Sequence, residues 1–364
     1  MRDRHIDTVG GIMILFVLYR HCLLATTSLE STLWGSAITY YPLLCYMAWF
    51  FFKSGMYFKE KEPLADSVKK GLVRLMIPYF CFSALAVIIS LAMNGILFGS
   101  SGIHNVISEI PVHLKREGAV VCNAPLWFLL SLFLARAFFS ASLRLHVPVW
   151  CTAIVSLAFA FGLYHWDLPV GMYFKNIALG LFFICIGFLL KDLQYSRAAF
   201  ITSIIVYIGY LVYCFCSRSV IGEFIINQHT PYFPTVVFYV AGCILFNNLF
   251  KRIGWLNGKW LSDIGKDSMI FYVTHFIIID IIVTLDKAVF HLSDWPLFLL
   301  LILALAITMP LFAKLFASPR FKWMMGEAPQ CVKAIRLSPV TAWCGVAVVT
   351  VSMLAYLTFQ IIHF

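Results

Sequence analysis

The sequence has few charged residues and no long polar segment. Only 12% of its 364 residues are charged, whereas soluble domains carry about 25%. No Ser/Gly-rich linker, soluble-domain-sized polar stretch or convincing internal repeat interrupts the chain. These absences exclude an ordinary soluble enzyme and predict a single membrane domain. The missing repeat also counts against transporters built from repeated halves.

The sequence also lacks a pattern of metal ligands and a cleavable signal. Its eleven cysteines are scattered, mostly inside apolar stretches, and we interpret them as small buried side chains. Cys214 and Cys216 are two residues apart, which puts them on different faces of a helix, so we expect no metal site. The apolar stretch behind Met1–Arg4 has no small-residue cleavage site, which indicates a first membrane span.

Long apolar runs dominate what is present. Hydrophobic residues make up 62% of the chain, and the mean hydropathy is +0.89. Runs of about 20 apolar residues can cross a hydrocarbon core of about 30 Å. The runs are continuous rather than alternating, which predicts an all-α polytopic integral membrane protein. We expect eleven spans, at about 9–27, 37–57, 72–98, 125–145, 148–165, 172–190, 198–217, 233–250, 268–290, 295–317 and 340–362.

The distribution of positive charge predicts the orientation. With the N-terminus in the cytoplasm, 21 of the 27 Lys and Arg residues lie on the cytoplasmic side, five lie opposite, and Arg20 lies within a span. This bias follows the positive-inside rule. The same bias accounts for the net charge of +10, so this charge does not indicate that the protein binds nucleic acid. We therefore predict a multi-pass protein of the inner (plasma) membrane, whose basic rim meets membrane lipids or an anionic cytosolic ligand.

The first predicted span keeps a titratable pair far along its length. HIDTVGGIMILFVLYRH (5–21) ends in Arg20 and His21. Ionisable side chains are costly in lipid, so two together indicate a polar cavity. Imidazole titrates near neutrality and can act as a base, an acid or an acyl carrier.

A second stretch joins an aromatic helix end to a basic segment. FFKSG (51–55) holds Lys53, Ser54 and Gly55, and Lys70 and Arg74 follow before RLMIPYF. Lys70 and Arg74 are four residues apart and would share a helix face. Two such cations suit a phosphate-rich cytosolic molecule, although positive-inside topology alone also explains them.

Two further stretches carry candidate cavity residues. NAPLWFLLSLF (123–133) contains Trp127, either an interfacial aromatic or a surface on which a sugar stacks. IGKDSMIFYVTHF (264–276) places Ser268 seven residues before His275, so both face one side of a helix. Asp280 lies about 140° round that helix from His275 and is a poor partner for it.

In these four stretches the chain resembles the membrane-bound acyltransferase-3 family, which includes O-acetyltransferases of surface polysaccharides. The motifs agree in order and spacing, and they cover residues 5–317. The resemblance implies a ten-helix core (1–317), with 318–364 forming a cytoplasmic loop and an added eleventh span. It also implies that no cofactor is bound. Acetyl-CoA would be the donor, and a glycan or lipid-linked sugar outside the cytoplasm the acceptor.

The resemblance also implies roles for individual residues. His21 matches the family's catalytic histidine, while Lys70 and Arg74 match the segment associated with CoA. One position departs from the family pattern. The family usually carries an arginine eleven residues before that histidine, and in this sequence Gly10 stands at that position. We hypothesise that Lys53 or Arg20 supplies the missing charge.

Two other classes of function also fit the sequence. A transporter or flippase for a lipid-linked sugar or an acyl metabolite would also use buried charge. A non-catalytic relative within a polysaccharide assembly complex would fit the change at Gly10. The sequence leaves open the acceptor sugar and its hydroxyl, the acyl chain, and whether the protein forms homo-oligomers.

Overall fold

The computed structural model describes residues 3–26, 43–168, 170–217, 231–327 and 337–363. These residues form helices and no strand, which confirms the all-α prediction. The α-helices are α1 (Arg4–Leu24), α3 (Tyr46–Met56), α4 (Leu64–Gly71), α5 (Ile77–Glu117), α6 (Trp127–Arg144), α7 (Val149–His165), α8 (Met172–Leu190), α9 (Arg197–Ser217), α10 (Tyr232–Arg252), α11 (Lys259–Lys266), α12 (Ser268–Leu285), α13 (Asp294–Ala317) and α15 (Pro339–His363).

The described chain contains eight stretches that are long and apolar enough to cross a membrane. One of them, Leu64–Arg144, contains α4, α5 and α6, and the shorter apolar helix α7 lies outside this set. The protein is therefore a multi-pass membrane protein. From residue 125 onward, each predicted span coincides with a helix to within a few residues at its start.

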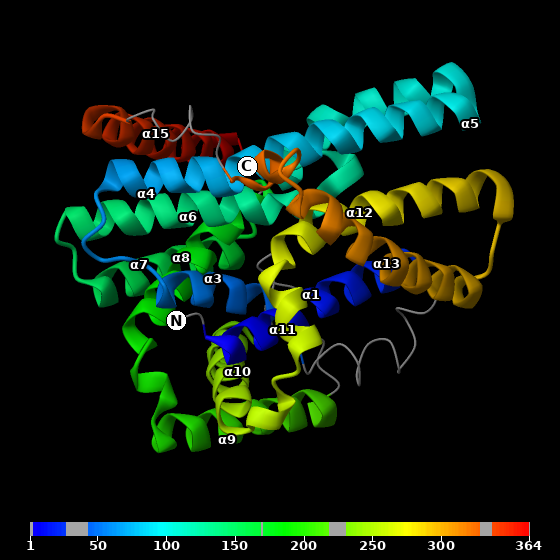
Figure 1. Cartoon of the computed structure of the whole chain (residues 1–364). Helices are drawn as coiled ribbons and strands as arrows, with labels where there is room; N and C mark the ends of the chain where they lie inside the picture. Colours follow the sequence, from blue (N-terminus) through cyan, green and yellow to red (C-terminus); the bar gives the residue numbers. More distant parts are fainter. Residues whose placement is uncertain (1–2, 27–42, 169, 218–230, 328–336, 364) are drawn as a thin grey trace.

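The second and third predicted spans differ from the structure. Part of the span at 37–57 falls on residues 27–42, which lie outside the described residues, and α3 begins at Tyr46. The third predicted span ends at residue 98, where the first arm of α5 ends, but the sequence did not predict the second arm, which runs on to Glu117. The chain turns at Gly99, whose φ of +67° suits glycine, and α5 folds back so that Gly102 lies against the Asn94 carbonyl (Figure 1).

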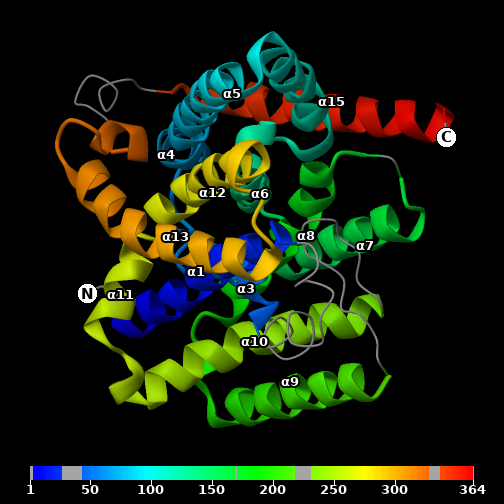
Figure 2. The same cartoon turned by 90° about the vertical axis from the view of Figure 1, so that its right-hand side faces the viewer.

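Helix α1 lies in the middle of the bundle. It contacts α3, α10, α11, α12 and α13, and Figure 2 shows it enclosed among these helices. Helix α15 runs along the outside, against α4 and α6 (Figure 1). The residues of α1 therefore meet protein on most sides, and 78% of its apolar window is buried inside the molecule.

Two close backbone contacts between helices depend on glycine. A Cβ atom at Gly55 in α3 would lie 2.0 Å from the Ile184 carbonyl oxygen of α8, and one at Gly187 would lie 2.0 Å from the Phe52 oxygen. In the same way, a Cβ at Gly265 of α11 would lie 1.7 Å from the Asp7 oxygen of α1. Small residues allow such approach in membrane bundles, where packing contacts drive association.

The N-terminal end of α1 is held by polar contacts outside the apolar core. Tyr57 donates its hydroxyl to Asp3 Oδ2 at 2.9 Å, and the Tyr195 hydroxyl lies 3.0 Å from His5 Nε2. Burial, and then the charges of Asp3 and Asp192, raise the pKa of Tyr195 to about 12. Tyr195 therefore stays protonated and can donate to His5, which anchors the start of α1.

Candidate functional site

His21 lies in the last turn of α1 and faces α12. Its ring centroid is 5.1 Å from that of His275 and 5.4 Å from that of Phe276. The sequence predicted both histidines as candidates but did not predict that they meet. The contact joins two helices that are more than 240 residues apart in the chain.

His275 is fully buried, at 0% exposure. Its Nδ1 lies 2.8 Å from the Tyr272 carbonyl oxygen and 3.1 Å from the Phe271 oxygen. Its Nε2 is buried and has no hydrogen-bond partner among the described residues. Ser268 lies at the start of the same helix, roughly 10 Å away along the axis at 1.5 Å per residue, so it does not reach the pair.

Hydrogen bonds join the 123–133 stretch to α12 close to His275. Asn123 donates from Nδ2 to the Val273 carbonyl at 2.9 Å, and the Tyr272 hydroxyl donates to the Pro125 carbonyl. Two of the four sequence stretches therefore lie side by side in space. Residues 121–126 form a short 3₁₀ turn, which brings these groups to the helix before α6 begins.

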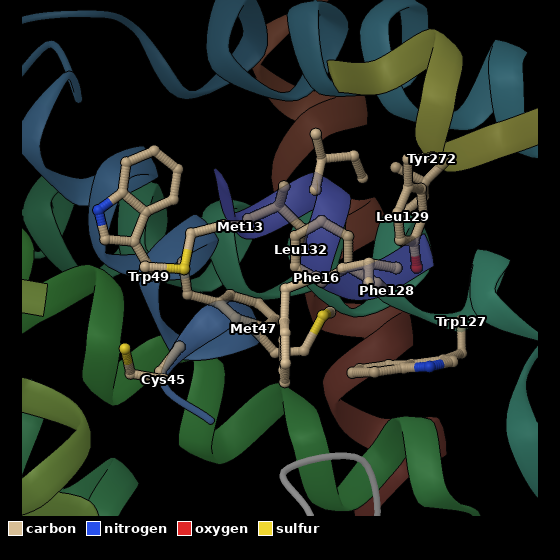
Figure 3. Close-up of a cluster of buried hydrophobic side chains, with 14 of the residues drawn as sticks. Met13, Phe16, Cys45, Met47, Trp49, Trp127, Phe128, Leu129, Leu132 and Tyr272 are labelled. Carbon is tan, nitrogen blue, oxygen red and sulfur yellow. The ribbon is translucent and has the colours of Figure 1, made fainter. Parts of the chain in front are cut away.

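Trp127 is 4% exposed and belongs to the hydrophobic core. Figure 3 shows the buried cluster around α1, with Met13 and Phe16 among Phe128 and Leu132, and with Trp127 at one side. Its indole is thus enclosed by protein rather than displayed on a surface. Arg20, beside His21 in the chain, is also buried, at 4% exposure.

The donor-side candidates gather in a basic cluster, which we define as Lys59, Lys70, Arg74 and Arg136. The charges of the other three act on Lys70, and the charge of Arg74 also acts on Arg136. Lys70 also forms an ion pair with Glu62. Arg74 lies in a π-helical turn, Leu72–Met76, and such turns are frequent at functional sites.

Arg136 is a site residue that the sequence analysis missed. It comes from α6, and its Nη1 donates to Ser54 Oγ at 2.5 Å, while its guanidinium lies over the Phe58 ring at 5.1 Å. It therefore joins the FFKSG stretch to the basic segment. Arg136 is one of the 21 positive charges counted on the cytoplasmic side, and its position inside a long apolar run is the signal that could have identified it.

Lys53 lies against α1 at Gly10. A Cβ atom built on Gly10 would lie 3.5 Å from Lys53 Nζ and 3.3 Å from the Trp49 ring. The ammonium group of Lys53 lies over that ring, 5.0 Å from its centroid. The indole is held in turn by a 2.8 Å hydrogen bond to Asn247 Oδ1 on α10. Of the two candidates for the missing charge, the structure puts Lys53 next to Gly10.

Two further observations concern the packing at Gly55 and the side chains that could bind a metal ion. The lack of a side chain at Gly55 lets α3 meet α8, as described above. Within the described ranges, no three His, Cys, Asp or Glu side chains gather in a group that could hold a metal ion.

A comparison with known protein families gives one match. The model of an acyltransferase domain, that of the acyltransferase-3 family, matches residues 4–314. No curated protein and no solved structure matches the chain. The match includes α1, the basic cluster and α12, and it ends before α15.

Proposed function

The chain belongs to the acyltransferase-3 family of membrane acyltransferases, and we propose that it moves an acetyl group from acetyl-CoA to a hydroxyl of a glycan. The donor would be cytosolic, and the acceptor would be extracytoplasmic or lipid-linked. The contact of His21 with His275 inside the bundle carries the proposal, since it places imidazole chemistry among helices rather than against lipid.

On the donor side, the basic cluster offers sites for the phosphates of CoA. Arg136 and Arg74 present guanidinium groups, which bind phosphate through paired hydrogen bonds. Lys70 adds a third charge, and Ser54 a hydroxyl. Glu62 offsets the charge of Lys70, and a polyanion bound at the cluster would offset the repulsion that remains among its cations. Lys53 would hold a donor oxygen nearer to α1.

The distance along α1 suits the length of a thioester arm. Gly10, beside Lys53, and His21 are eleven residues apart and share a helix face, a rise of roughly 16 Å. An extended pantetheine chain could run along this face, with its phosphates at the basic end and its thioester at His21.

His21 would act in one of two ways, each balanced in atoms. As a base, it takes the proton of the acceptor hydroxyl while the oxygen attacks the thioester carbon. The C–S bond then breaks, and the thiolate receives that proton. As a nucleophile, a ring nitrogen attacks the thioester carbon, and the C–S bond breaks to release the thiolate. The acceptor oxygen then attacks the acetyl carbon, the N–C bond breaks, and the hydroxyl proton goes to the thiolate.

The test measures CoA release and acetyl transfer with purified protein in lipid vesicles. His21→Ala should abolish both, because the acceptor proton and the acetyl group lose their carrier. Arg136→Met should raise KM for acetyl-CoA about tenfold, since one charged hydrogen bond is worth about 1.5–3 kcal/mol. Lys191→Met, which removes a cation lying over Phe188 at the end of α8, is the matched control.

The result decides between the classes of function. A transporter or an assembly scaffold would release no CoA from acetyl-CoA. Loss of surface-glycan acetylation in cells that carry His21→Ala, measured by mass spectrometry, would identify the acceptor. Trapped acetyl on His21 after exposure to acetyl-CoA alone would favour the nucleophilic route.

A further inference from the structure

The tautomer of His275 is determined by its hydrogen bonds. Backbone carbonyl oxygens only accept, so the Nδ1 atom that contacts the Tyr272 and Phe271 oxygens must carry the proton. In a neutral imidazole, Nε2 then has a lone pair and no hydrogen. His275 can therefore only accept a hydrogen bond at Nε2.

That acceptor is buried and unused. Within the part of the chain that the structure describes, Nε2 has no hydrogen-bond partner, although the residue is 0% exposed. A buried polar atom without a hydrogen bond costs about 1–3 kcal/mol, so its retention calls for an explanation. Packing alone would be served by an apolar side chain of similar size.

His21 is the group placed to use it. The centroids of the two rings are 5.1 Å apart, with an angle of 44° between their planes. At this separation a nitrogen of one ring reaches hydrogen-bonding distance of the other when their edges face. A turn of the His21 ring about its side-chain bonds would bring its N–H to Nε2. Phe276, 5.4 Å from His21, limits that ring from another direction.

We propose that His275 is a positioning residue that accepts a hydrogen bond from His21 and so selects the tautomer of His21 used in acyl transfer. The inference rests on the proposed function. The hydrogen of His21 stays on the nitrogen that faces His275, and the opposite nitrogen keeps its lone pair for the acceptor proton or the acetyl group.

The charge that develops in the reaction explains why the pairing is useful. When His21 takes the hydroxyl proton, or when it forms the N–C bond as the C–S bond breaks, its ring becomes positive. The lone pair of His275 then lies against an N–H that has become a stronger donor. The role needs no proton transfer to His275, which takes part only as a hydrogen-bond acceptor. A base oriented by a third group is a recurring arrangement in group-transfer enzymes.

Two variants separate this role from simple packing. In His275→Gln, the side-chain amide can place its oxygen acceptor near the position of Nε2. In His275→Asn, the shorter amide reaches only the position of Nδ1, so it keeps the backbone hydrogen bond and loses the acceptor. Both are compared with wild type at equal amounts of monodisperse protein.

The first measurement is transfer from acetyl-CoA. We expect His275→Asn to lower kcat by about 10²-fold, the lower end of what positioned acid–base catalysis contributes, with KM for acetyl-CoA unchanged. His275→Gln should recover most of the lost kcat. An equal loss in both variants would overturn the proposal, because a hydrogen-bond acceptor would then not be the feature that matters.

The second measurement needs no turnover. Diethyl pyrocarbonate acylates unprotonated imidazole nitrogens, and its rate at His21 is followed by mass spectrometry, with the exposed His146 as the internal reference. His275→Asn should slow the reaction at His21 relative to His146, and His275→Gln should not. A wild-type rate at His21 in His275→Asn would overturn the inference, whatever happens to kcat.

The two measurements also separate this inference from the proposed function. If the wild-type protein releases no CoA from acetyl-CoA, the proposed function fails, and the modification rates alone decide whether His275 positions His21.

Discussion

The ammonium group of Lys53 lies where α1 has no side chain, at Gly10. Its place is set by contacts that the sequence does not show: the Trp49 ring beneath it and the Asn247 hydrogen bond that holds the indole. At the residue scale, a cation on α3 therefore lies beside α1 at the position where the resemblance to the family implies an arginine.

This placement predicts the behaviour of a small set of variants. Lys53→Met should lower kcat/KM for acetyl-CoA about tenfold, because a charged hydrogen bond of about 1.5–3 kcal/mol is lost. Lys53→Arg should keep most of the activity. Adding Gly10→Arg to Lys53→Met should restore part of it, once the Trp49 ring shifts by a few tenths of an ångström to admit the new Cβ. Steady-state transfer rates measure all three.

Arg20→Met provides the comparison. Wild-type rates in Lys53→Met together with a loss in Arg20→Met would assign the compensating charge to Arg20. Wild-type rates in both variants would remove the compensation hypothesis.

At the scale of elements, glycine sets how closely α3 approaches α8. The Cβ positions of Gly55 and Gly187 fall 2.0 Å from backbone oxygens of the facing helix, and backbone cannot move aside as a flexible side chain can. This contact holds the end of α3, where Lys53 and Ser54 lie, at a set distance from the rest of the bundle. The glycine of the FFKSG stretch therefore has a packing role independent of any ligand.

We predict that Gly187→Ala lowers the thermal unfolding temperature of the purified protein. Overpacking typically costs about 1–3 kcal/mol, and here the added methyl group meets backbone. The matched control is Gly209→Ala on α9, where a Cβ would meet nothing within 4 Å. That change should leave the unfolding temperature unchanged or slightly raised, since alanine favours helix over glycine. Equal shifts in the two variants would contradict this account.

At the scale of the whole molecule, α15 is set apart from the rest. Only 6% of its apolar window is buried inside the protein, compared with 78% for α1. It contacts α4 and α6 from outside, and the family match ends at residue 314, before α15 begins. The helices α1 and α12, which carry His21 and His275, pack without it, whereas α4 and α6, which carry Lys70 and Arg136, meet it at one small apolar cluster.

Truncation after Glu327 should therefore leave kcat unchanged, because α15 packs against α4 and α6 rather than against the helices that carry His21 and His275. The cut keeps Gly326, whose backbone packs against Val73 beside Arg74. Transfer assays on vesicles that contain equal amounts of the two forms measure the effect. A large fall in kcat with normal thermal unfolding would show that α15 contributes to the site.

The sequence by itself determined the class of protein and most of its helices. Apolar length depends only on residues adjacent in the chain, which explains why the spans from residue 125 onward were predicted closely. It also supported the family, whose motifs are local. The short helices α4 and α11 were not predicted from the sequence. Each has only eight residues, several of them charged, so neither forms a long apolar run. The reversal of direction within α5 was not predicted either, because it depends on the backbone conformation at Gly99.

Only the tertiary structure decided which candidate residues lie close to one another. It brought His21 to His275, put Lys53 at Gly10 and added Arg136 to the basic cluster, because each pairing joins different helices. Periodicity reports which face a residue occupies on its own helix. It does not report which helix that face meets, since that depends on packing between residues far apart in the chain.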